Sequence, residues 1–84
     1  MQVTLRLGVG LGGQPWWPPR TMDMEDGATL ADLLGRLEEP VRADLLQPHV
    51  LVIVNGRRFD QSEAAHRTLR DGDVVAVVAA TAGG

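Results

Sequence analysis

The residues with the clearest chemical potential are the last two of the chain, Gly83 and Gly84. Glycine loses the most backbone freedom on ordering and has no side chain to pack, so a Gly-Gly end is a poor structural element. It does present an unhindered carboxylate on a thin tether. We therefore expect residues 80–84 to form a flexible tail, whose carboxylate is either the reactive group of the protein or idle.

Other candidate sites are weak. Residues 8–13 contain the spacing G-x-G-x-x-G, which in dinucleotide-binding folds opens a helix whose N-terminus holds a pyrophosphate. Here three prolines follow within residues 14–19, so we expect a loop. His49 and His66 are isolated and the chain has no cysteine, which argues against a metal site or a thiol nucleophile. We expect no catalytic activity from the chain alone, and no metal or cofactor bound by it.

Composition narrows the class of protein further. The 84 residues suffice for one domain, and 44% hydrophobic residues favour a globular core. The formal net charge of −3 disfavours a nucleic-acid partner, and no apolar run approaches the roughly 18–20 residues of a membrane span. We therefore expect a cytoplasmic protein that binds neither nucleic acid nor membrane.

The first half of the chain predicts a hairpin followed by a helix. Apolar residues alternate over residues 2–9 and again over residues 20–25, which indicates two half-buried strands joined by a loop. Thr29 and Asp32 have the spacing of a helix-capping box. A leucine stripe follows at helical spacing, consisting of Leu30, Leu33, Leu34 and Leu37. Pro40 ends this helix or starts a short second turn.

The second half predicts mainly strands. The apolar run 50–54 indicates a central strand buried on both sides, and Asn55-Gly56 is a strong hairpin signal before a return strand at 57–60. A helical turn in 61–67, a tight turn at 69–73 and a last strand at 74–78 complete the pattern. The fold class is α+β: a β-grasp (ubiquitin-like) domain over residues 1–79. One main helix packs across a mixed sheet of four or five strands, and the last strand lies beside the first.

Three motifs, in this order, carry a family resemblance. Asp26-Gly27-Ala28-Thr29-Leu30 enters the helix, Val54-Asn55-Gly56 makes the hairpin, and Leu69-Arg70-Asp71-Gly72-Asp73 precedes the last strand, before the terminal Gly-Gly. This arrangement resembles the MoaD/ThiS family of ubiquitin-like sulfur carriers over most of the chain outside residues 10–19.

The resemblance implies a mechanism and partners. A ubiquitin-activating-type (E1-like) adenylyltransferase would use its ATP to adenylate the carboxylate of Gly84, and a sulfur donor would convert it to a thiocarboxylate. Gly83 would let the tail thread a narrow channel, because any Cβ would clash there. The sulfur would pass to a synthase subunit of the molybdopterin-synthase or thiazole-synthase type.

The sequence leaves alternatives open for the surface that binds partners and for the pathway that receives the sulfur. By position relative to Gly84, we expect Leu7, Phe59, Val78 and Ala82 to contribute partner contacts, with burial in the core as the alternative for the first three. Trp16 and Trp17 either fold back on the core or form an exposed patch. Molybdopterin biosynthesis is the preferred pathway, with thiamine thiazole, cysteine or a natural product as alternatives. A ubiquitin-like modifier and an adaptor with an idle tail are the hypotheses of other classes.

Overall fold

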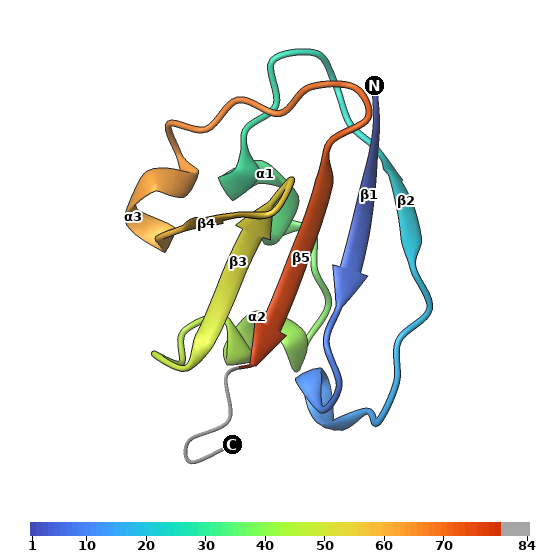
Figure 1. The fold of residues 1–84 in the computed structure, drawn as a ribbon, viewed down its shortest axis with the longest axis vertical. Coiled ribbons are helices and arrows are strands. Elements are labelled where there is room, and N and C mark those ends of the chain that lie inside the picture. The colour runs from blue at the N-terminus through green and yellow to red at the C-terminus, as the bar shows by residue number, and fades with distance from the viewer. Residues whose placement is uncertain (80–84) are drawn as a thin grey trace.

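The five strands form one mixed sheet in the order β2-β1-β5-β3-β4 (Figure 1). A computed structural model describes residues 1–79, apart from the side chain of Gln61. β1 and β5 run parallel at the centre, and the other neighbouring pairs are antiparallel. The strands are β1 (Gln2–Leu7), β2 (Arg20–Asp23), β3 (Val50–Val54), β4 (Arg57–Phe59) and β5 (Val74–Ala79). The predicted β-grasp architecture is confirmed, including the last strand beside the first.

The helical residues form several short pieces instead of one long helix. They are η1 (Leu11–Gly13), α1 (Leu30–Gly35), α2 (Val41–Asp44) and α3 (Gln61–Ala64). The capping box at the start of α1 is confirmed: Asp32 N–H donates to Thr29 Oγ1 at 3.2 Å, and Thr29 N–H donates to Asp32 Oδ2 at 2.9 Å. The whole leucine stripe from Leu30 to Leu37 is buried, although regular α-helix ends at Gly35.

The core lies between one side of the sheet and the helices α1 and α2, which Figure 1 shows behind the strands. Inward-pointing residues of β1, β3 and β5 are buried, whereas their neighbours in sequence are half-buried or exposed. The prediction that β3 is buried on both sides is therefore wrong. Leu51 and Ile53 are only half-buried, because the described helices cover one face of the sheet.

The predicted hairpin between β3 and β4 is confirmed. Asn55 has a φ of 51° and Gly56 a φ of 82°, the left-handed conformations that a two-residue hairpin turn requires. The turn brings Arg57 opposite Val54 and Phe59 opposite Val52. Among residues 1–79 no helix is long and apolar enough to cross a membrane.

Candidate functional site

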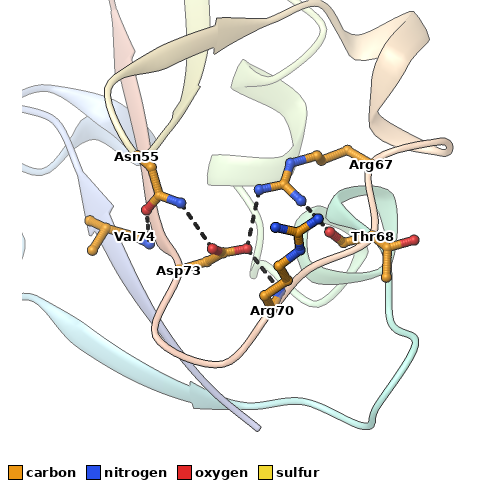
Figure 2. Close-up of polar contacts among 6 residues, drawn as sticks. All are labelled: Asn55, Arg67, Thr68, Arg70, Asp73 and Val74. Carbon is orange, nitrogen blue, oxygen red and sulfur yellow. Dashed lines mark hydrogen bonds and ion pairs between the residues drawn. The ribbon is translucent and has the colours of Figure 1, made fainter.

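The start of β5 is fixed by a buried carboxylate, Asp73, which sequence analysis treated only as part of a turn. The residue is only 5% exposed. Asn55 Nδ2 donates to Asp73 Oδ1 at 2.9 Å, and the backbone N–H of Arg70 donates to Asp73 Oδ2 at 2.8 Å (Figure 2). An Arg67 guanidinium nitrogen lies 3.4 Å from the same Oδ2. The carboxylate thus joins the β3–β4 hairpin to the loop before β5.

Asn55 completes this connection with the other half of its amide. Its Oδ1 accepts a hydrogen bond of 2.9 Å from the backbone N–H of Val74, the first residue of β5. Asn55 N–H in turn donates to the carbonyl oxygen of Val74 at 2.9 Å. In the sequence, the only indication of this contact is that Asn55 directly follows one strand and Asp73 directly precedes another. Their contact depends on the strand order, which the motif spacing does not specify.

From this anchor, β5 runs through the middle of the sheet and ends at Ala79. Its neighbours are β1 in parallel, with Leu7 opposite Val77, and β3 in antiparallel, with Val50 opposite Ala79. The predicted functional residues Ala82, Gly83 and Gly84 lie outside the described residues. The structure thus places Ala79, the last described residue before the Gly-Gly sequence, at one end of the sheet.

One face of the sheet has no helix packed on it among the described residues. We define this open face by the side chains that alternate with the buried ones and share a side through their strand register. Its members are Gln2, Thr4, Arg6, Thr21, Asp23, Leu51, Ile53, Arg58, Val74, Ala76 and Val78. The centre, from β3 and β5, is apolar and half-buried except for the exposed Val74, whereas Arg6 and Arg58 are exposed on either side. An apolar centre with a polar rim is typical of a protein-binding surface.

The predicted contact residues divide between the two faces. Val78 belongs to the open face, opposite Leu51. Leu7 is 8% exposed and packs in the core, so it has little surface to offer a partner. Phe59 pairs with Val52 and therefore points to the helix side, where it is half-buried at the edge of the core. The three residues do not form one patch, because side chains of a strand alternate between faces.

The two tryptophans also separate. Trp17 is half-buried: its Nε1–H donates to the carbonyl oxygen of Leu11 at 2.8 Å, and the Arg20 guanidinium lies 5.2 Å from its ring centroid. Trp16 is 66% exposed. Trp17 therefore folds back on the core, whereas Trp16 is exposed.

A family model described as the ThiS family matches residues 18–84. The chain belongs to the ThiS family. The match excludes β1 and most of the following loop and runs through both terminal glycines. No curated protein matches the chain significantly.

Solved structures of similar proteins support the same fold. The Haloferax volcanii HVO 2177 protein is 30% identical, with a TM-score of 0.73, over 100% of this chain and 87% of its own. A Pyrococcus furiosus protein described as molybdopterin converting factor, subunit 1, is 21% identical with a TM-score of 0.68, over 95% of this chain and 98% of its own. SAMP1 from Haloferax volcanii is 20% identical with a TM-score of 0.68, over 100% of both chains. This ThiS-family chain therefore has the ubiquitin-like β-grasp fold of the MoaD/ThiS sulfur carriers.

Proposed function

We propose that this ThiS-family protein carries sulfur on the carboxylate of Gly84. The observation that carries the proposal is the family match, which extends through Gly83 and Gly84. An oxygen of the carboxylate attacks the α-phosphate of ATP on a partner enzyme, and pyrophosphate leaves. Sulfide then attacks the carbonyl carbon of the acyl-adenylate. The C–O bond to AMP breaks, and a thiocarboxylate remains.

The division of labour follows from the chain's own residues. The sequence contains no cysteine and no lysine, so a terminal carboxylate is its natural place to hold sulfur. The chain supplies the carboxylate, its tether and a docking surface, while the partner supplies ATP and the catalytic groups. In this proposal the protein is a co-substrate of other enzymes.

The geometry of β5 limits where a partner must bind. Five residues follow Ala79 in the sequence, and a fully extended chain of that length spans about 17 Å. An enzyme that acts on Gly84 must therefore cover surface within that distance of Ala79. Val78 on the open face is the adjacent residue, and Leu51 lies opposite it. We propose that partner enzymes dock on the open face, through its apolar centre.

The chemistry of the open face also specifies the partner's surface. Arg6 from β1 and Arg58 from β4 lie on opposite sides of the apolar centre, and neither has an ion-pair partner among residues 1–79. A complementary surface carries apolar side chains in the middle and carboxylates on both sides. Such charge pairs set orientation and association rate more than affinity.

For the sulfur acceptor, we propose the large subunit of a molybdopterin-synthase-type enzyme. The Pyrococcus furiosus protein of similar fold is described as a molybdopterin converting factor subunit, which supports this choice. A thiazole synthase is the alternative to be compared. The purified thiocarboxylate form is incubated with each acceptor, and loss of the thiocarboxylate by intact mass identifies the one that accepts sulfur.

The carrier chemistry itself is tested at the terminus. The protein is incubated with an E1-like adenylyltransferase, ATP and sulfide, and intact mass is expected to show replacement of one oxygen by sulfur. Deletion of Gly84 shortens the tail by about 3.5 Å, and small misplacements at a reaction centre reduce rates strongly. Gly83→Ala keeps the length but adds a methyl group and restricts φ.

Both variants should lose thiocarboxylate formation by about 100-fold or more, with the deletion the worse. Ser62→Ala is a control at an exposed position in α3, outside the tail and the open face, and it should react at the parental rate. Parental rates for the deletion variant would show that Gly84 is not the reactive group. Higher-mass adducts on lysines of added proteins would instead favour a ubiquitin-like modifier.

A further inference from the structure

Three arginines converge on one hollow at the end of the sheet opposite to Ala79. The hollow has a volume of about 470 Å³ and is lined by Val54, Asn55, Arg57, Phe59, Arg67 and Arg70. Val54 and Val50 are the two ends of β3, about 13 Å apart, and Val50 is the residue paired with Ala79. The hollow is therefore at the other end of the sheet from Ala79.

The hollow carries an unbalanced positive charge in a protein of net charge −3. None of the side chains that line it is a carboxylate. The nearest negative charge among the contacts of these arginines is Asp73, which is already bound to Arg67, to Asn55 and to the backbone of Arg70. Three guanidinium groups beside one buried carboxylate leave a local charge of +2.

The arginine side chains are held in place without an anion. The guanidinium of Arg57 lies 5.2 Å from the Phe59 ring centroid and that of Arg67 lies 5.7 Å from it. Arg67 also donates to the carbonyl oxygen of Thr68. The side chains of Arg67 and Arg70 both line the hollow. Two like charges held together repel each other, and a bound anion relieves that repulsion.

We propose that this hollow is a binding site for a phosphoryl group. A dianionic phosphate matches the local charge of +2, and its several oxygens can each accept hydrogen bonds from a different planar guanidinium. A single carboxylate would balance only half of this charge. The aromatic ring of Phe59 forms an apolar wall beside the guanidinium groups of Arg57 and Arg67 and limits the directions in which they can turn. The phosphoryl group can come from free phosphate or from a nucleotide.

The test measures anion binding to the full chain by NMR at low ionic strength. Inorganic phosphate and ATP are titrated separately, with succinate as a dianion of similar charge and different geometry. We expect saturable shifts of the Phe59 ring and of the Asn55 and Arg67 signals with phosphate. If ATP binds with an affinity similar to that of phosphate, the site recognises the phosphoryl group alone. If ATP binds much more tightly than phosphate, the site recognises nucleotide phosphates.

Variants decide whether these arginines are responsible. Arg57→Ala combined with Arg70→Ala should weaken phosphate binding at least about tenfold, since each removes a charge-assisted hydrogen-bond donor. Arg36→Ala combined with Arg42→Ala is the matched control, with the same change of net charge away from the hollow. Thermal melting checks that both double variants are folded. The proposal is overturned by equal binding of succinate, by shifts that do not saturate, or by equal weakening in the control.

Discussion

At Asp73, burial raises the pKa of the carboxyl group, whereas hydrogen bonds and nearby arginines lower it. The hydrogen bonds from the Arg70 backbone and Asn55 and the charges of Arg67 and Arg70 outweigh the effect of burial. The net result is a pKa below the ordinary value for aspartate. The ionised form is the one that holds the β3–β4 hairpin to the start of β5.

A lowered pKa in the folded state makes the stability depend on pH in a defined direction. Between the folded and unfolded pKa values the unfolded chain binds more protons, so the stability contributed by Asp73 is full above about pH 4 and declines as the pH falls further. Asp73→Asn removes this titration. Chemical denaturation between pH 3 and 6 should therefore show a shallower acid loss for Asp73→Asn than for the parent. Equal slopes would assign the acid sensitivity to other carboxylates.

Most of the loop between β1 and β2 lies outside the family match. Hydrogen bonds and close packing nevertheless anchor this loop to the rest of the protein. Gly12 N–H donates to Asp44 Oδ2 of α2 at 2.7 Å, and Trp17 hydrogen-bonds across the loop to Leu11. A Cβ at Gly12 would lie 2.8 Å from Val41 Cγ2 and 3.1 Å from the Trp17 ring, so only glycine allows this close packing. The loop is thus held against α2 at the end of the sheet where β5 stops.

We expect alanine substitutions of the two adjacent tryptophans in this loop to change the free energy of unfolding by different amounts. Trp17→Ala removes a half-buried ring and its hydrogen bond, and it should lower the free energy of unfolding by about 1–3 kcal/mol. Trp16→Ala alters an exposed side chain and should change it by less than about 0.5 kcal/mol. Urea denaturation of the two variants measures the difference. Equal losses would mean that Trp16 also packs on the protein.

On the scale of the whole molecule, the one-sided covering of the sheet leaves an apolar face beside the strand that leads to Gly84. Val78→Asp places a charge in the middle of the open face, next to Leu51 and beyond the core. We expect at least about a tenfold loss of affinity for the E1-like partner, because a charge at an apolar interface centre is desolvated without a partner. Isothermal titration calorimetry measures this affinity.

Ala65→Asp provides the comparison for that variant, since Ala65 is exposed at the end of α3 and lies outside the open face. It introduces the same charge change and should keep the parental affinity. A Val78→Asp variant that melts like the parent and binds with equal affinity would exclude the open face as the docking surface. In that case the exposed loop residue Trp16 becomes the next surface to test.

Much of the fold is readable from local patterns. The Thr29–Asp32 capping box and the Asn55-Gly56 turn each depend on contacts within a few residues, and each is confirmed. The first strand is confirmed for residues 2–7, but its predicted extension to Val9 is wrong, because the chain turns after Leu7 and leaves Val9 76% exposed. The expected order of central strands is also confirmed, because a β-grasp places the last strand beside the first. The burial of β3 on both sides is not, since its apolar run reflects strand formation as well as burial.

The sequence by itself determined the elements, the family resemblance and the unhindered Gly-Gly end, because these depend on residue types and short-range spacing. Only the tertiary structure decided which side of the sheet each residue occupies. Strand register separates Val78 from Leu7 and Phe59, and it brings Asn55 to Asp73 across 18 positions of the chain. The same long-range packing gathers Arg57, Arg67 and Arg70 around one hollow, which Phe59 also lines. Contacts between residues far apart in the chain follow from strand pairing and helix packing, which no local pattern specifies.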